Sequence, residues 1–576
     1  MTEGRSARRA FFWALLLALI VAAPAAWQAR FESDDYIQLA LLEERLPVEL
    51  SQSRYDIYTF LDGSPQSFER LLDRGPVPWF AHPELRVRFW RPVTAAALTL
   101  ETMVFGTESR PYHLMSLAWY LAAVLAVGLL LRELLPERIF FLALLIFAVA
   151  SSHRQIVTWL ASRYVSLSLV LGALAMWSHV RFRASSTFGG WLSAVLWILA
   201  LLAGESSLGW LGFLVSWELL AGRRPGRWKA LLTPIVIAVI WLSVYVSLGY
   251  GTRASGAYVN PVSEPLGFLA IAPARFFGLL ACALFGFQAD IWLWQPEWRL
   301  AFIVSGVLAI PVGFWLWRFA RREIDEASRP GFDALTLGAV LALIPQTAGM
   351  IGPRSLAVSS VGGAALLGGV SFAAWRAFQR RREHRPSLSV RFGIALSAVL
   401  FFSHAIAAPV LWFVWTAVYA PILDATDEAM NRVEVRPDQD AVLLQATNPL
   451  SSIYLPARRG FEGRSTPRSW WVLSFRPGPI VVTRIDEQSF ILGASEPAPA
   501  TPFELILRTP ADPLAVSDKV ETAGFEAEVL EVQNGQPTRV RFTFRRPLES
   551  PDLLWLDADL EPVTMPAIGE SIRLDS

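Results

Sequence analysis

Two adjacent carboxylates, Asp34 and Asp35, follow the first long apolar stretch of this 576-residue chain. They stand in the segment RFESDDYIQLALLEE, which begins at Arg30. A carboxylate held beside another can remove a proton from a hydroxyl or bind a divalent cation. The pair can also cap the helix that the following residues predict, because Ser33 and acidic side chains suit a helix N-terminus. Spacing alone favours capping and leaves the chemical role as the alternative.

Further polar side chains that could take part in chemistry lie between apolar runs. His153 and Arg163 lie in SSHRQIVTWLASR. Arginine is a preferred partner of phosphate, although an arginine at a membrane interface also anchors a helix end. Glu205 in LLAGESSLG and Arg354 in GMIGPRSLAVSS are similarly placed. A carboxylate costs about 3 kcal/mol at the centre of a membrane helix, so Glu205 is expected to have a partner or a task. A solvated turn is the alternative for both residues.

The elements that must position these residues are membrane spans. The chain is 53% hydrophobic and holds 24 Trp, and its apolar runs reach the length of about 20 residues that crosses a bilayer. We interpret the first run as a retained helix rather than a cleaved signal peptide, because it is long enough to span. About eleven spans are expected, at 10–27, 113–132, 139–152, 164–180, 190–203, 207–221, 230–249, 300–318, 334–350, 357–376 and 391–417.

The arginines predict the orientation of these spans. The clusters RSARR, LRELLPER, RFR, RRPGRWK, RFARRE and RRREHR all fall in the cytoplasm if the N-terminus is cytoplasmic and the C-terminus is outside, as the positive-inside rule requires. Residues 30–111 then form a long first external loop that carries both aspartates. The apolar segment 265–298 does not fit this count and is predicted to be re-entrant or to lie along the outer interface.

The composition changes after residue 424. Short runs typical of β-strands alternate with turn residues. They are DAVLLQATN, WWVLSF, PIVVTRI, SFILGA, FELILRT, FEAEVLEV and TRVRFTFRR. The sequence therefore predicts a membrane domain over 1–424 and a soluble, β-rich extracytoplasmic domain over 425–576.

Several classes of protein are excluded. Cys282 is the only cysteine, which excludes an intrachain disulfide and a cysteine-based metal site. The sequence contains no Walker motif, no H-E-x-x-H, no G-x-G-x-x-G after a strand and no nucleic-acid motif. Few charges lie inside the predicted spans, which argues against an ion pump, a proton-coupled carrier or a flippase for lipid-linked glycans.

The order of these features, over about residues 10 to 380, resembles the GT-C superfamily of membrane glycosyltransferases. The most similar branch contains the protein O-mannosyltransferases and their bacterial relatives. The resemblance implies that an acidic residue in the first external loop is the catalytic base or a metal contact, a position that Asp34 and Asp35 occupy. A divalent cation, Mg²⁺ or Mn²⁺, assists some members of the family, and a metal-independent enzyme is the alternative.

Other positions of the family pattern are carried over by the same resemblance. The residues implied in binding the donor phosphate or its lipid are Arg91, His153, Arg163 and Arg354, and those in supporting roles are His113, Trp159 and Glu205. The chain departs from the pattern at Ser116, Ala118 and Trp119, at Gln155, and at Gly204.

The resemblance implies a hexosyl- or mannosyltransferase-like enzyme in a bacterial inner membrane. A polyprenyl-phosphate sugar would donate to an acceptor hydroxyl on the outer face, with Asp34 or Asp35 as the base and Arg163 or Arg354 beside the phosphate. The acceptor, whether protein, lipid or polysaccharide, is not specified. The alternative is a catalytically inactive GT-C-like scaffold that works through its C-terminal domain.

Overall fold

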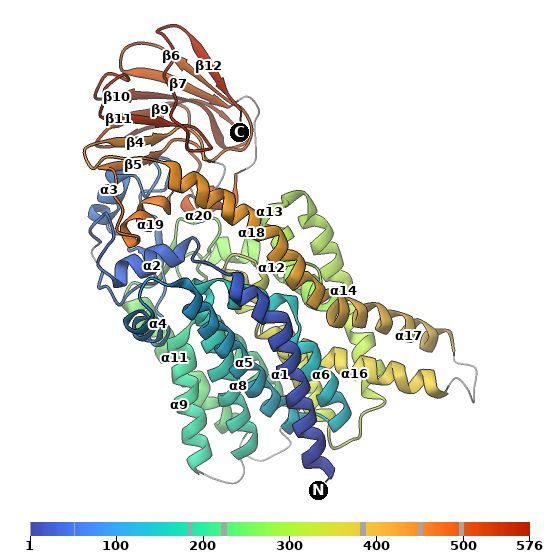
Figure 1. Ribbon diagram of the computed structural model, residues 1–576. Helices are drawn as coiled ribbons and strands as arrows, with labels where there is room; N and C mark the ends of the chain where they lie inside the picture. The colour runs from blue at the N-terminus through green and yellow to red at the C-terminus, as the bar shows by residue number, and fades with distance from the viewer. Residues whose placement is uncertain are drawn as a thin grey trace. The chain divides into compact units, whose positions relative to one another are not determined.

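The computed structural model describes residues 2–50, 52–182, 187–220, 227–380, 387–446, 453–494 and 500–575, and Figure 1 colours the chain from the N- to the C-terminus. The chain forms two compact units. The helical unit comprises Met1–Arg30, Trp90–Leu248 and Leu266–Val418, and the β-rich unit comprises Phe31–Phe89, Gly249–Pro265 and Tyr419–Ser576. This differs from the predicted division after residue 424, because residues 31–89 and 249–265 form part of the β-rich unit.

Nine helices within the described residues are long and apolar enough to cross a membrane. A bent pair, α6 (Glu137–Ala148) with Ser151–Thr158, adds a tenth if it forms one span. The nine are Ser6–Gln28 in α1 (Thr2–Gln28), Ser109–Leu134 (α5), Leu160–Phe182 with α8 (Arg163–Phe182), Lys229–Ser247 in α11 (Arg227–Ser247), Pro265–Phe285 (α12), Pro296–Arg321 with α14 (Arg299–Arg321), Arg329–Ala348 with α15 (Arg329–Leu341), Ser359–Arg380 (α16) and Leu388–Arg432 with α17 (Leu388–Phe401) and α18 (Ala408–Arg432). The chain is therefore a multi-pass membrane protein, and the predicted fold class, a helical membrane region followed by a β-rich region, is confirmed.

The described residues contain fewer candidate spans than the expected eleven. The predicted spans at 190–203 and 207–221 correspond to α9 (Thr187–Ala203) and α10 (Gly209–Leu220), which have 17 and 12 residues. At a rise of about 1.5 Å per residue, a helix of 12 residues is too short for a hydrocarbon core of about 30 Å. Hydropathy correctly predicted both helices but not that they are too short to be counted as spans.

The segment 265–298 begins with α12, a continuous helix of 21 residues that is long enough to cross a membrane, so the re-entrant alternative is wrong. The other alternative, a helix along the outer interface, stays a prediction. The short helices α13 (Ala289–Trp294) and η4 (Pro296–Trp298) follow. The orientation of the spans stays a prediction.

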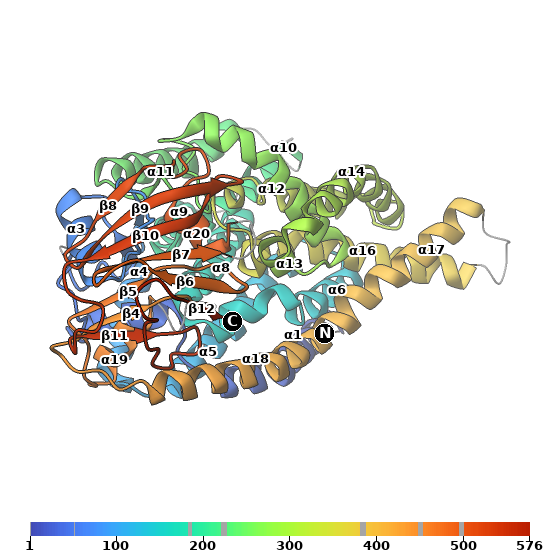
Figure 2. The ribbon, with the colours of Figure 1, turned by 90° about the horizontal axis from the view of Figure 1, so that it is seen from above.

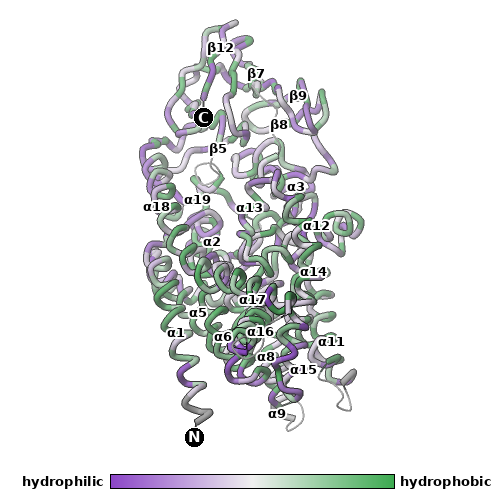
Figure 3. Tube along the Cα trace, turned by 90° about the vertical axis from the view of Figure 1, so that its right-hand side faces the viewer, coloured by the Kyte–Doolittle hydropathy of each residue, from purple (hydrophilic) through white to green (hydrophobic). Residues whose placement is uncertain are grey.

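The candidate spans show apolar side chains on their outer faces. On α14, Leu300, Val304 and Phe314 are 71%, 50% and 58% exposed. Figure 3 shows hydrophobic residues along most of α1 and α5. Exposed apolar surface of this extent is expected where lipid replaces water.

Glycines allow the helices of this unit to approach closely. A Cβ added at Gly362 on α16 would lie 2.0 Å from the carbonyl oxygen of Leu335 on α15. One added at Gly306 on α14 would lie 1.9 Å from the carbonyl oxygen of Phe277 on α12. Small residues at such crossings are typical of packing between membrane helices, where backbones must come together.

The described part of the β-rich unit contains three sheets, and Figure 2 shows the strands of the largest side by side. The six-stranded sheet is antiparallel with the order β12-β6-β7-β10-β9-β8, the second is β11-β4-β5 and the third is β1-β2-β3. β4 and β5 are parallel and are connected through α19, so they form a β–α–β crossover. The elements of this unit are α2 (Asp34–Leu42), β1 (Thr59–Leu61), α3 (Pro65–Arg74), β2 (Arg86–Arg88), β3 (Gly251–Arg253), β4 (Asp440–Leu443), α19 (Leu455–Phe461), β5 (Ser469–Val472), β6 (Ile480–Arg484), β7 (Ser489–Ala494), α20 (Pro502–Leu507), β8 (Lys519–Glu521), β9 (Phe525–Gln533), β10 (Gln536–Phe544), β11 (Leu553–Leu556) and β12 (Ser571–Leu574).

The core of this unit joins segments that are far apart in the sequence. Trp79, from the predicted first loop, packs edge-on against Phe542 of β10 with ring centroids 5.6 Å apart. Its indole N–H donates to the carbonyl oxygen of Leu473 at 2.9 Å. Residues 251–253 add β3 to the edge of β2. Residues 61–87 therefore contribute to the same hydrophobic core as the C-terminal strands.

One predicted strand is wrong. The run FELILRT lies in α20 and the residues that follow it, because Thr501 and Glu504 form a capping box and Pro502 occupies the first helical turn. By contrast, the runs that predict β9 and β10 form a hairpin. Its two-residue turn, Asn534 and Gly535, has φ values of 53° and 73°, as a type I′ turn requires.

Candidate functional site

The two opening carboxylates have different environments at the start of α2. Asp35 is fully buried, and its Oδ2 accepts a hydrogen bond from the backbone N–H of Glu32 at 3.1 Å. Asp34 is half-buried, and its Oδ1 accepts a hydrogen bond from the Tyr454 hydroxyl at 2.7 Å. Ser33, at φ 50°, makes no side-chain capping bond. Capping therefore describes Asp35 better than Asp34, whose carboxylate is held by a side chain.

Tyr454 is set in a buried position beside α19. Burial raises its pKa well above the usual value, and the nearby charge of Asp34 raises it further. The hydroxyl therefore stays protonated and donates to the carboxylate. Aromatic contacts fix α2 against α19, with Phe461 lying 5.7 Å from Phe31 and 6.3 Å from Tyr36 between ring centroids. Residues about 420 positions away thus hold Asp34 in place.

In the helical unit, Arg163 is enclosed by partners. It is fully buried, and its Nη1 pairs with the carboxylate of Glu101. Its Nη2 donates to the carbonyl oxygen of Tyr112 at 2.8 Å and to Ser116 Oγ at 2.9 Å. A buried guanidinium with these partners stabilises the contact between α4 (Pro92–Phe105), α5 and α8. The predicted contact with a donor phosphate would require that these bonds open.

His153 is also completely buried. One ring nitrogen lies 2.9 Å from Ser360 Oγ, and the other lies 3.3 Å from the hydroxyl of Tyr120. The Phe147 ring lies 4.6 Å away between centroids. His113, on α5, is buried as well. These surroundings favour a structural role for His153, and its predicted role in lipid binding stays a prediction.

Arg91 and Glu205 form an ion pair. Arg91 Nε donates to Glu205 Oε2 at 2.8 Å, and its guanidinium carbon lies 3.5 Å from the ring centre of Tyr164. The other oxygen of Glu205, Oε1, is buried and has no hydrogen-bond partner among the described residues. The expected partner of Glu205 is therefore Arg91, and the second oxygen keeps an unused accepting position.

Arg354 lies in a half-exposed position beside an aromatic ring. Its guanidinium carbon is 4.7 Å from the ring centre of Trp159. Asp290 is near enough for the charge of Arg354 to influence it, and it pairs with Arg154 at 3.6 Å. Burial raises the pKa of Asp290 above its usual value, while the charges of both arginines oppose this shift. The cluster thus combines two cations with one partly buried acid.

Sequence reasoning missed Tyr454, Arg154 and Asp290. Asp290 in the apolar run FGFQADIWLW has the same signature as Glu205, an isolated acid between apolar residues, and could have been found on that ground. Arg154 directly follows His153. For Tyr454, no local signal points to Asp34.

The helical unit also contains a large apolar cavity of about 530 Å³. Helices α6, α12, α14, α15 and α16 line it, with few polar groups among them. Ser360, the partner of His153, is one of these polar groups. A cavity of this size and character can hold part of an apolar chain.

A metal site is not apparent in the described part of the chain. It contains no group of three or more His, Cys, Asp or Glu side chains that could hold an ion. The predicted role of Mg²⁺ or Mn²⁺ stays a prediction.

No protein-family model and no curated protein matches this chain. It is similar to the oligosaccharyltransferase AglB of Archaeoglobus fulgidus, solved with an inhibitory peptide and a dolichol-phosphate, at 13% identity and a TM-score of 0.42. That match covers 80% of this chain and 64% of the other, so the chain spans less than two thirds of its length.

Two further similarities have the same level of identity. ArnT of Cupriavidus metallidurans, bound to undecaprenyl phosphate, gives 12% identity and a TM-score of 0.40 over 79% of this chain and 88% of the other. The arabinofuranosyltransferase AftD from Mycobacteria gives 13% and 0.40 over 94% and 40%. At these values the similarities assign neither a family nor a substrate to this chain.

Proposed function

We propose that this protein is a GT-C type glycosyltransferase that moves a sugar from a polyprenyl-phosphate donor to an acceptor hydroxyl on the outer face of the membrane. The order of motifs over residues 10 to 380 supports the proposal. The single observation that carries it is the half-buried carboxylate of Asp34, oriented by the buried hydroxyl of Tyr454. A carboxylate that is partly accessible and oriented by a hydrogen bond is suited to receive a proton.

In the proposed reaction, Asp34 accepts the proton of the acceptor hydroxyl. The acceptor oxygen then forms a bond to the anomeric carbon, and the bond between that carbon and the phosphate oxygen breaks. The polyprenyl phosphate leaves with the electron pair, and the anomeric configuration is inverted. Asp35, which is buried and bonded to the backbone of Glu32, is assigned to positioning α2.

For the donor phosphate we assign Arg354. It is half-exposed and rests on Trp159, whereas Arg163 is buried among its partners. A guanidinium stabilises the charge that develops on a phosphate leaving group, and this stabilisation is strongest in the transition state. The apolar cavity of the helical unit is the assigned place of the lipid chain.

The test is sugar transfer in membranes that contain equal amounts of each variant, with a panel of radiolabelled polyprenyl-phosphate sugars as donors. Asp34→Asn should reduce transfer at least about 100-fold, because the base is lost. Glu69→Gln, which changes an exposed acid in the same segment, is the matched control. Transfer that survives Asp34→Asn at the wild-type rate would reject Asp34 as the base.

A non-enzymatic scaffold is the second candidate. The observation that favours it is the Tyr454 contact itself, because a hydrogen bond between two parts of the β-rich unit also explains Asp34 as a purely structural residue. A scaffold predicts no transfer from any donor, together with a lower melting temperature for Asp34→Asn.

A further inference from the structure

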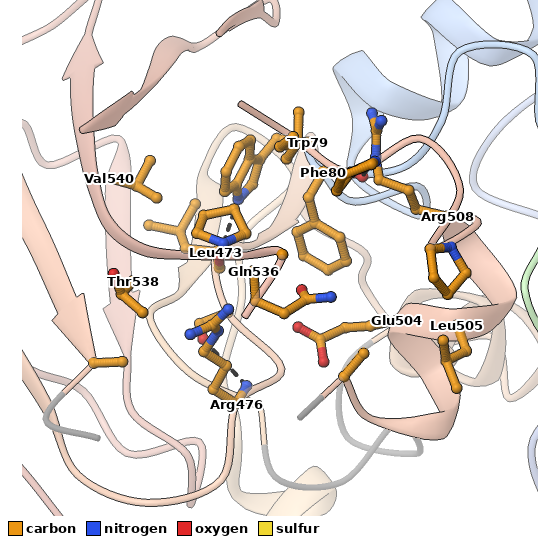
Figure 4. A pocket seen from close by; sticks show the side chains of 18 of the residues that line it. Trp79, Phe80, Leu473, Arg476, Glu504, Leu505, Arg508, Gln536, Thr538 and Val540 are labelled. Atoms are coloured by element: carbon orange, nitrogen blue, oxygen red, sulfur yellow. Dashed lines mark hydrogen bonds between the residues drawn. The ribbon is translucent and has the colours of Figure 1, made fainter. Parts of the chain in front are cut away.

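A partly enclosed pocket in the β-rich unit has no role in the proposed transfer. It lies between the hairpin of β9 and β10, the helix α20, and two aromatic residues of the first loop, Trp79 and Phe80. Figure 4 shows that Arg476, Gln536 and Glu504 point into the same hollow, with the Phe80 ring beside them. Its volume is about 60 Å³.

Arg476 is the unusual group in this pocket. Its residue exposure is 7%, and neither Nη1 nor Nη2 has a hydrogen-bond partner among the described residues. Thr538, on β10, is 6% exposed, and its hydroxyl likewise has no partner there. Arginine is normally buried only with a partner, because an unpaired buried charge is strongly unfavourable. Burial correspondingly lowers the pKa of Arg476, an effect that the charge of Glu504 opposes.

The other charged side chains of the pocket are already engaged. Arg508 donates to the carbonyl oxygens of Phe80 and Asp512 at 2.8 and 3.0 Å. Glu504 Oε2 accepts a hydrogen bond from the backbone N–H of Thr501 at 2.7 Å, as part of the capping box of α20. Arg476 and Thr538 thus stand out as buried groups of the pocket whose donors have no partner among the described residues.

We propose that this pocket binds an anionic group, a carboxylate or a phosphate carried by a small molecule, through the Arg476 guanidinium and the Thr538 hydroxyl. Guanidinium donors match both anions in geometry. The volume suits one such group rather than a whole ring, since a cavity that holds benzene measures about 150 Å³. The remainder of the ligand must extend out of the pocket, and the nearby charge of Glu504 disfavours a second negative charge on it. The proposal does not depend on the proposed transferase function.

The experiment measures the melting temperature of the full-length protein in detergent while the ligand is titrated at constant ionic strength. Inorganic phosphate, glucose 1-phosphate and glucuronate are the probes, and neutral glucose is the control. At least one of the anions should raise the melting temperature in a saturable manner, because a ligand that binds the native state stabilises it. A response to glucuronate alone would identify a carboxylate ligand, and a response to the phosphates alone a phosphate.

Variants give effects of opposite sign. Arg476→Gln should weaken the response about tenfold or more, since it removes the charged donor, and Thr538→Val should weaken it less. Glu504→Gln keeps an oxygen for the capping bond and removes the repelling charge, so it should strengthen the response. Arg539→Gln, an exposed arginine on β10, should leave it unchanged.

Arg476→Gln is expected to fold, because it replaces an unpaired buried charge with a neutral side chain. No response to any of the three anions would overturn the proposal. So would equal responses of the wild type and Arg476→Gln.

Discussion

At the scale of residues, the two main chemical types of the candidate site, arginine and carboxylate, occur in both structural and accessible settings. Arg163 and Arg354 have the same side chain, but Arg163 is fully buried with Glu101, and Arg354 is half-exposed on Trp159. The degree of burial, rather than residue type, therefore separates the structural from the functional assignment.

This contrast predicts different consequences of two substitutions. Arg163→Gln leaves the Glu101 carboxylate buried without its cation, which should lower stability by about 3 kcal/mol or more. Arg354→Gln should leave the melting temperature nearly unchanged and should reduce sugar transfer. Melting temperature in detergent and transfer in membranes measure the two effects.

Two controls accompany this prediction. Arg110→Gln removes another arginine that rests on a tryptophan, Trp27, with 4.3 Å between the guanidinium carbon and the ring centre, and should not affect transfer. The double variant Glu101→Gln with Arg163→Gln should recover part of the lost stability. If Arg163→Gln were as stable as the wild type, the ion pair would not be a structural one.

The hydroxyl of Tyr454 gives a second prediction at this scale. Tyr454→Phe distinguishes the catalytic from the structural role of Asp34, because it deletes the hydrogen bond to Asp34 Oδ1 and keeps the buried ring. A bond to a charged group contributes about 1.5–3 kcal/mol, so transfer per folded molecule should fall about tenfold if the bond orients the base. Unchanged transfer with a lower melting temperature would indicate a structural contact, and Tyr55→Phe, at an exposed tyrosine, is the control.

At the scale of elements, the absence of a side chain at Gly362 allows the close crossing of α15 and α16. Gly362→Ala places a methyl group against the carbonyl oxygen of Leu335 and should force the helices apart, at a cost of about 1–3 kcal/mol. Gly363→Ala is the matched control, because an added Cβ there has nothing within 4 Å. It should be neutral or slightly stabilising, since alanine favours helix more than glycine does. The melting temperatures of both variants test this, and equal values would argue against the close approach.

The elements were predicted from sequence where hydropathy or alternation is strong. The run at 113–132 is α5, and the runs FEAEVLEV and TRVRFTFRR are β9 and β10. FELILRT was misassigned because its apolar residues outweighed the capping signal of Thr501 and Glu504. The pairing of Asp34 with Tyr454 could not be predicted, because no local pattern relates residues so far apart in the chain.

At the scale of the whole molecule, the distribution of arginine predicts which side of the membrane each loop faces. The chain offers a direct test, because Cys282 is its only cysteine and is buried. In a Cys282→Ala background, Glu521→Cys in the β-rich unit should react with a membrane-impermeant maleimide in intact cells. Arg181→Cys, in the predicted cytoplasmic cluster RFR, should react only after the membrane is permeabilised. The reverse pattern would invert the predicted orientation.

The β-rich unit is assembled from three separate stretches of chain, and this has a consequence for its biosynthesis. The ribosome completes residues 31–89 about 330 residues before it reaches Tyr419. At about 5–20 residues per second, that interval is on the order of tens of seconds. During it, Phe68, Leu72 and Trp79 lack the C-terminal partners that complete their core. The apolar side chains of the nascent first loop must therefore be kept from aggregating until translation ends. A fragment that starts at residue 419 would lack part of its own hydrophobic core.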